Sequence, residues 1–197
     1  TPRMRMRMLA VWARWFHTYV SLLGFAALVF FSVTGLTLNH ADWFEDVSSE
    51  REITREMPSD LIETTLEDSA AVLRLFDRIR NAESLSGAVE EVVVEAGYAA
   101  VSLQGPGYVA DLTIDFEAGE YSVFETRRGF WSVATDLHKG RHTSGAWSLL
   151  IDGSAVVLTL SGLTGIWLLW YLKKIRWRGL AVSAVGLIAL LGLAVVA

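Results

Sequence analysis

Hydrophobic and polar positions divide the chain into three long apolar runs, with a polar stretch between the first two. The twenty residues 19–38 and the nineteen residues 179–197 contain no Asp, Glu, Lys or Arg, and residues 147–172 contain only Asp152. About 20 helical residues cross the hydrocarbon core of a bilayer. The pattern therefore predicts three membrane-spanning helices, at residues 15–40, 147–172 and 179–197.

The polar stretch, residues 41–146, shows the periodicities of a small α+β domain. Residues 41–60 are polar and acidic, which predicts an irregular connection. Apolar positions recur with a 3.6-residue period over residues 65–80, which predicts a helix. Alternating segments then predict strands, with turn residues at 105–107 and 117–120. These expected strands are 92–94, 98–103, 108–116 and 121–124. We expect one helix packed on a meander of three or four strands, inserted between the first two membrane helices.

Composition narrows the classes of protein that the chain can belong to. Of its 197 residues, 52% are hydrophobic and none is cysteine. These values exclude an all-soluble enzyme, a disordered chain and a disulfide-stapled secreted module. They also exclude thiolate metal sites and a cysteine nucleophile. The polar stretch shows no nucleophile–base pair, no phosphate-binding glycine loop and no basic patch for nucleic acid, so whether the protein is an enzyme stays open.

Charge placement predicts how the helices are oriented. Four of the 17 Lys and Arg residues lie in the basic leader, residues 1–14, and four lie in the link 173–178. The polar stretch holds the other nine cations and 21 of the 22 acids, a net charge of −12. Because Lys and Arg beside membrane segments are retained in the cytoplasm, the leader and the link are expected inside and residues 41–146 outside.

The first apolar run could be mistaken for a secretory signal, since it follows a basic leader. It exceeds the roughly 7–15 residues of a signal core, and no small-x-small cleavage motif follows it before Asn39 and His40. We therefore expect a retained helix that contacts membrane lipids. The third run has no polar face and is expected to be a lipid-facing or packing anchor.

All four histidines lie close to the apolar runs. His17 lies at the cytoplasmic end of the first run and His40 at its outer end, whereas His138 and His142 precede the second run. If residues 136–142 are helical, the i, i+4 spacing places both later rings on one face. Since the first helix emerges at His40 on the same side of the membrane, we expect three imidazoles to converge near the outer boundary.

Convergent imidazoles on neighbouring helices are the axial ligands that b-type haem requires. Gly24 and Gly35 lie on the His17 face of the first helix and leave room for a macrocycle. His17 and His40 are 23 residues apart, or ~34 Å along a helix, so they cannot bind one iron. We therefore expect one haem per chain, held by His40 and one or both later histidines. His17 is an interfacial anchor, or an inner ligand completed by another chain.

The same residues allow a different ligand. His40, His138 and His142 could bind zinc, copper or iron directly, with Asp136 or Asp42 as a fourth ligand. A His-x-x-x-His pair does not distinguish these choices.

Two further features carry charge near the membrane. Arg127, Arg128, Lys139 and Arg141 form the main basic cluster of the acidic stretch, and they are candidates for holding haem propionates or for salt bridges within the domain. Asp152 lies a few residues inside the second apolar run, where an acid is costly. It is expected to make a structural polar contact or to take part in proton uptake.

Residues 15–24, 32–40, 136–142 and 160–168 together resemble the PepSY-associated transmembrane family. Larger members of that family include inner-membrane ferric-siderophore reductases that carry b haems. The resemblance implies a PepSY-like domain in residues 41–146, a place in the bacterial inner membrane, and haem-mediated electron transfer to an exported acceptor, such as a ferric chelate, or within a complex.

The resemblance also bears on single residues and on assembly. Histidines at positions 17 and 138 are typical of the wider family, whereas those at 40 and 142 are similar to features of a shorter branch. Three helices are fewer than a large reductase has, so a homo-oligomer or a subunit of a membrane complex is expected, with Gly162 available for close packing. A second hypothesis is a non-redox protein that binds peptides, restrains a protease or steadies a neighbouring complex.

Overall fold

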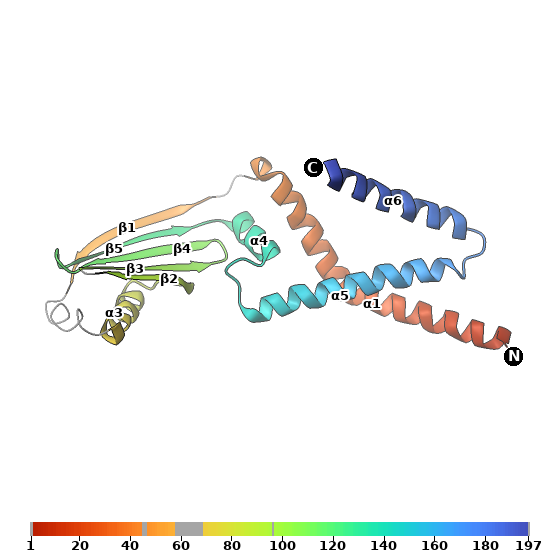
Figure 1. The fold of residues 1–197 in the computed structure, drawn as a ribbon, viewed down its shortest axis with the longest axis horizontal. Helices are drawn as coiled ribbons and strands as arrows, with labels where there is room; N and C mark the ends of the chain where they lie inside the picture. The colour runs from red at the N-terminus through yellow and green to blue at the C-terminus, as the bar shows by residue number, and fades with distance from the viewer. Residues whose placement is uncertain (1, 45–46, 58–68, 96, 197) are drawn as a thin grey trace. The chain divides into compact units, whose positions relative to one another are not determined.

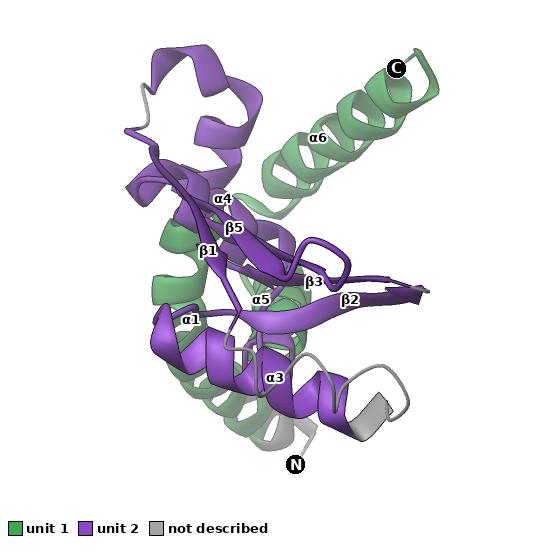
Figure 2. Cartoon of the chain, turned by 90° about the vertical axis from the view of Figure 1, so that its left-hand side faces the viewer, with its two compact units in different colours: residues 1–31, 149–197 green, residues 32–148 purple. Residues whose placement is uncertain are grey.

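The structure, a computed structural model, describes residues 2–44, 47–57, 69–95 and 97–196. It divides into two compact units, one of residues 1–31 and 149–197 and the other of residues 32–148 (Figure 2).

Three helices of the described residues are long and apolar enough to cross a membrane. They are α1 (Pro2–Asn39), from Met8 onward, α5 (Gly145–Leu169) and α6 (Arg176–Val196) (Figure 1). The predicted three-helix pattern is therefore confirmed by length and composition. The basic leader is part of α1 rather than a separate segment, because that helix starts at Pro2.

The second unit contains an α+β domain between α1 and α5, as predicted. Its helix and strands are α3 (Ser69–Ala82), β1 (Ser49–Glu56), β2 (Ala88–Glu95), β3 (Tyr98–Gly105), β4 (Tyr108–Asp115) and β5 (Glu120–Arg127). The strands form one antiparallel sheet in the order β1-β5-β4-β3-β2. A 3₁₀ turn, η1 (Ala41–Trp43), follows α1, and helix α4 (Phe130–Lys139) follows β5. The first four residues of the predicted helix, 65–68, lie outside the described residues.

The core of the domain lies between α3 and one face of the sheet (Figure 1). Alternate residues of β3, β4 and β5 face the helix and are buried, as period-2 geometry requires. Leu103, Leu112, Ile114 and Val123 are the largest fully buried side chains among the described residues. They meet the apolar side of α3, which presents Leu75, Phe76 and Ile79 among others.

Strand β1 corrects the expectation that residues 41–60 form an irregular connection. Its eight residues pair with β5, and the register sets Arg51 opposite Glu125, Ile53 opposite Val123 and Arg55 opposite Tyr121. The three β1 residues named therefore lie on the helix side of the sheet. Two of them are arginines, so the hydrophobic pattern of a half-buried strand is absent. The alternation of Arg51, Ile53 and Arg55 with polar residues is the signal that could have indicated this strand.

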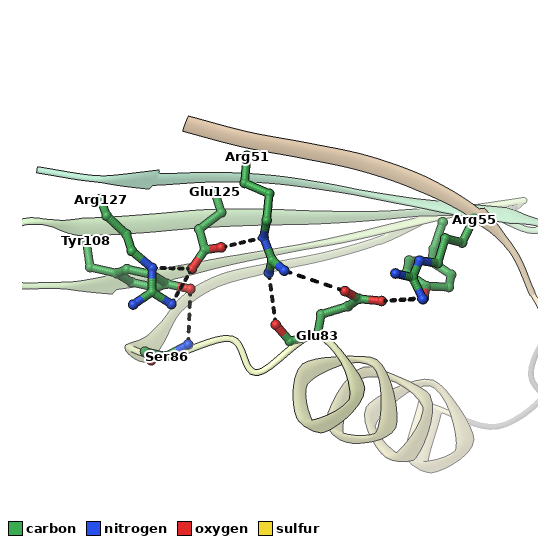
Figure 3. A network of polar contacts seen from close by, with 8 residues as sticks. Arg51, Arg55, Glu83, Ser86, Tyr108, Glu125 and Arg127 are labelled. Atoms are coloured by element: carbon green, nitrogen blue, oxygen red, sulfur yellow. Dashed lines mark hydrogen bonds and ion pairs between the residues drawn. The ribbon is translucent and has the colours of Figure 1, made fainter. Parts of the chain in front are cut away.

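Charge pairs take the place of apolar packing along β1 (Figure 3). Glu125 is 3% exposed and accepts contacts of 2.7 Å from both Arg51 Nε and Arg127 Nη2. Glu83, 6% exposed at the end of α3, lies 3.5 Å from Arg55 Nη1. Arg51 also donates to the Glu83 carbonyl oxygen at 2.9 Å. The network thus joins β1 to both β5 and the end of α3.

The two tyrosines beside the network respond to its charges. Burial raises the pKa of Tyr108, and the neighbouring Glu125 raises it further. Burial likewise raises the pKa of Tyr121, whose hydroxyl donates to Glu83 at 3.0 Å. Burial alone would raise the pKa of Glu125, but hydrogen bonds from Arg127 and Tyr108 and the charges of Arg127 and Arg51 outweigh it, so that pKa lies below its ordinary value of 4.5.

Replacing the buried carboxylate should loosen β1 selectively. Glu125→Gln keeps the shape but points an amide donor at one of two arginines, at a cost of about 2 kcal/mol. Amide hydrogen exchange in β1 and β5 of the full chain should then accelerate roughly 30-fold, since 1.4 kcal/mol corresponds to a factor of ten. Glu52→Gln, on the exposed face of the same strand, is the control and should change exchange by less than about threefold. Equal effects of the two variants would show that the charge network does not hold β1.

Acid should weaken the domain through the same carboxylate. Because the pKa of Glu125 is lower in the folded state, the unfolded chain takes up the proton first. The stabilisation is complete above the ordinary pKa of 4.5 and is lost as the pH falls through the folded-state pKa. Exchange protection of β1, corrected for intrinsic rates, should decline between pH 5 and pH 3 in wild type. A Glu125→Gln variant with the same decline would assign it to other groups.

Candidate functional site

Helix α4 is attached to the turn between β3 and β4. The Gly107 N–H donates to Asp136 Oδ2 at 2.9 Å, and the Gly107 carbonyl oxygen accepts from the Arg128 N–H at 2.8 Å. Gly107 has a φ of +66°, and an added Cβ would lie 2.5 Å from Val133 Cγ2. Any other residue would strain the backbone here and would displace the Val133 side chain, so the turn is closely packed against α4.

The end of α4 corrects the expectation that His138 and His142 share a helical face. Gly140 adopts the left-handed conformation, with φ 65°, and its N–H donates to the Leu137 carbonyl, while the Arg141 N–H donates to that of Asp136. This Schellman pattern ends the helix at Lys139. His138 therefore lies in the last turn of α4 and His142 lies beyond the helix.

His138 contacts the C-terminal part of α1. Its Nδ1 lies 2.6 Å from Thr34 Oγ1, and Thr34 is buried. The next residue, Gly35, has no side chain, and a Cβ there would lie 3.4 Å from His138 Cε1. The ring thus lies against the helix backbone, with one nitrogen oriented by a hydroxyl.

The other two histidines of the predicted cluster have different partners. His40, at the end of α1, stacks on Trp43 with ring centroids 3.9 Å apart. His142 Nδ1 lies 3.8 Å from a carboxylate oxygen of Glu90 at the start of β2. Residues 2–44, 47–57, 69–95 and 97–196 contain no group of three or more His, Asp or Glu side chains that could hold a metal. The predicted convergence of three imidazoles is thus not assembled here, and their ligand roles stay predictions.

A cavity of about 300 Å³ lies between α4 and the end of α1. Three cations line it, Arg128, Lys139 and Arg141, together with Asp136. Its remaining lining residues are hydroxyl, aromatic and aliphatic: Thr37, Leu38, Ala41, Phe44, Trp131, Ser132 and Thr135. The cavity is therefore suited to an anionic group attached to an apolar body.

The predicted basic cluster is divided by the structure. Arg128, Lys139 and Arg141 share the cavity, but Arg127 points to Glu125 on the core side of the sheet. Strand alternation explains the division, because neighbouring residues at the end of β5 face opposite ways.

Within the first unit, His17 has a similar setting to that of His138. Its Nδ1 lies 2.9 Å from Thr164 Oγ1 of α5, and a Cβ on Gly165 would lie 3.2 Å from His17 Cε1. One turn further along α1, Ser21 Oγ lies 2.7 Å from Ser161 Oγ. Both histidines thus contact a Thr-Gly pair.

These threonines are the site residues that the sequence reasoning missed. The repeated Thr-Gly dipeptide, at 34–35 and 164–165, is the signal that could have indicated them. Asp152 is exposed on α5, and its expected role stays a prediction.

Comparison with known proteins identifies one family. A family model described as PepSY_TM-like matches residues 11–197. Neither the curated proteins nor the solved structures include a match to the chain.

The packing of α1 on α5 can be tested with cysteines, because the chain has none of its own. Ser21→Cys combined with Ser161→Cys should give a disulfide under mild oxidation, since the two hydroxyl oxygens are only 2.7 Å apart. The matched control pairs Ser21→Cys with Ser154→Cys, two helical turns or ~10.5 Å away, and should stay reduced. Mass spectrometry of the full chain in a membrane measures both. Bridging in neither pair, or in both alike, would contradict the contact.

Proposed function

Because the chain belongs to the PepSY_TM-like family, we propose that it is a membrane protein that binds b-type haem through His138 and relays electrons at the outer membrane face. The observation that carries this proposal is the Thr34–His138 hydrogen bond, with Gly35 against the ring and a cationic cavity beside it.

The donor chemistry of His138 fits an axial ligand. Ligating histidines usually use one ring nitrogen for a hydrogen bond that fixes the tautomer and ring orientation. At His138 that nitrogen is Nδ1, held by Thr34, so an iron would be bound by Nε2. Thr34 acts here as a positioning residue, and Gly35 lets the ring approach α1 closely.

The charges of the cavity fit the two propionates of haem. Arg128, Lys139 and Arg141 provide three positive charges against the single carboxylate of Asp136, which already accepts from Gly107. Charge-assisted hydrogen bonds to carboxylates are stronger than neutral ones. For Arg141 we therefore propose propionate binding, one of the two roles that the sequence allows it.

His40 is the proposed second ligand. Its neighbours Leu38 and Ala41 line the cavity, so His40 lies at the end of α1 that is closest to the cavity. To bind an iron there it would have to leave its stacking on Trp43. His142 is the alternative, and it would have to leave Glu90. Bound haem supplies reversible one-electron iron chemistry, while the chain holds and orients it.

The proposed orientation is supported by the cations of the leader and of the link between α5 and α6. In this orientation residues 1–14 and 173–178 lie on the cytoplasmic side of a bacterial inner membrane. A haem near the outer boundary then serves an exported acceptor, such as a ferric chelate, or a partner subunit. His17 with Thr164 is available as an inner ligand if a second chain contributes the other imidazole. The need for an imidazole from a second chain favours a homo-oligomer or a complex.

Replacing His138 is the decisive test. Full-length protein purified from a haem-supplied membrane should show a Soret band and about one haem per chain by pyridine haemochrome. His138→Ala should lower haem content at least tenfold, and Thr34→Val should weaken haem binding roughly 10-fold to 100-fold by removing the orienting hydroxyl. His40→Ala should leave a five-coordinate spectrum, whereas His142→Ala should leave the spectrum unchanged. The reverse result would assign the second ligand to His142.

Two results would overturn the proposal. Wild-type protein without a Soret band would favour the non-redox alternative, in which the domain only binds or steadies other proteins. Stoichiometric zinc, copper or iron by elemental analysis, in protein without haem, would instead favour direct metal binding.

A further inference from the structure

The two edge strands of the five-stranded sheet differ in the side chains that they present to the helix side. Strand β1 at one edge presents Arg51 and Arg55 to the helix side and engages both in ion pairs. Strand β2 at the other edge presents valines to the helix side, Val92 opposite Val101 and Val94 opposite Ala99. On the helix side of the sheet, the β2 edge is therefore apolar, whereas the β1 edge is charged.

The valines of β2 are not covered by α3. Val92 is 43% exposed and Val94 52%, and Leu73 on the facing side of α3 is 54% exposed. A groove of about 190 Å³ lies between Leu73 and Val92. Its floor is formed by residues of β3 and β4 that belong to the core, Val101, Leu103 and Leu112. Exposed aliphatic side chains grouped around one groove are typical of a binding surface.

The same edge offers backbone hydrogen bonds. In the sheet order of the described strands β2 has β3 as its one neighbour, so half of its N–H and C=O groups point outward. A bulge between Val89 and Glu91 interrupts the ladder, and His142 lies beside Glu90 at that point. The regular part of the edge, residues 91–95, is long enough for a short added strand.

Charge decides what can bind there. Glu91 and Glu95 lie on the sheet face away from α3, opposite Ser102 and Tyr98, and Asp77 lines the groove. Arg80 also lines the groove, and it donates hydrogen bonds to the carbonyl oxygens of Leu85 and Gly87 at 3.4 and 2.6 Å. A second copy pairing edge to edge would bring like charges together, which destabilises strand pairs.

We propose that an extended segment of a partner protein with alternating apolar and basic residues adds to β2 as a sixth strand. Its apolar side chains fill the groove beside Leu73 and Val92, and its basic side chains lie over Glu91 and Glu95. Strand addition of this kind takes affinity from main-chain hydrogen bonds and specificity from alternate side chains. The site is independent of the haem proposal, because it shares no residue with it.

Fluorescence anisotropy of the full chain in neutral detergent, with labelled seven-residue peptides, tests the proposal. A peptide alternating Lys and Val should bind, whereas one alternating Glu and Val, and one with the same Lys and Val in two blocks, should bind at least tenfold more weakly. Methylation of the backbone nitrogens of the peptide that would donate to β2 should also abolish binding, because it removes the hydrogen bonds between the two strands.

Charge-matched variants separate the edge from general electrostatics. Glu91→Lys with Glu95→Lys should weaken binding of the alternating peptide at least tenfold. Glu50→Lys with Glu52→Lys makes the same charge change on β1 and should alter it less than twofold. Leu73→Lys tests the groove, with unchanged exchange protection of β3 and β4 as the folding control.

Three outcomes would overturn the proposal: equal binding of the alternating and block peptides, equal effects of the two double variants, or a dimer of the chain that the β2 variants dissociate.

Discussion

The hydrogen bond from the Gly107 N–H to Asp136 is the contact on which the candidate site depends. It attaches α4 to the turn between β3 and β4, and the backbone bond between Arg128 and Gly107 secures the same turn from the other side. Once α4 is held there, His138 meets Thr34, and Lys139 and Arg141 face the cavity at the end of α1. A small antiparallel domain thereby positions an imidazole and a cavity lined by cations at the end of an apolar helix. The proposed haem function uses each of these consequences.

The second constraint on the domain is its size. A module this small buries little apolar surface, and α3 packs mainly on β3, β4 and β5. At β1 the solution is electrostatic, because Glu83 and Glu125 are buried and are paired with arginines of the strand. On the helix side of β2, Val92 and Val94 stay exposed instead, and Val92 lines an apolar groove. The ion-paired edge at β1 and the exposed edge at β2 therefore have a common origin, since one helix does not cover the whole sheet.

Bilayer-length apolar runs predicted the three long helices. Apolar periodicity predicted α3 and four of the five strands, because each of these elements buries side chains at its own regular period. Strand β1 escaped that reasoning, since its inward positions hold Arg51 and Arg55 and their partners are supplied by distant residues. The i, i+4 pairing of His138 and His142 was wrong because Gly140 ends the helix between them, a stop that its residue type indicates. The roles of Thr34 and Thr164 depended on contacts across 104 and 147 residues of sequence, which no local pattern contains.

The sequence by itself determined the class of this protein: three apolar helices, an acidic domain between the first two, no thiolate chemistry, and four histidines near the apolar runs. Those properties depend on composition and on spacing along the chain, which folding does not change. Only the tertiary structure decided which histidine lies against a glycine and a hydroxyl, which cations share a cavity, and which edge of the sheet stays open. Each of these depends on side chains brought together from separate elements, and their distances are set by packing rather than by sequence separation.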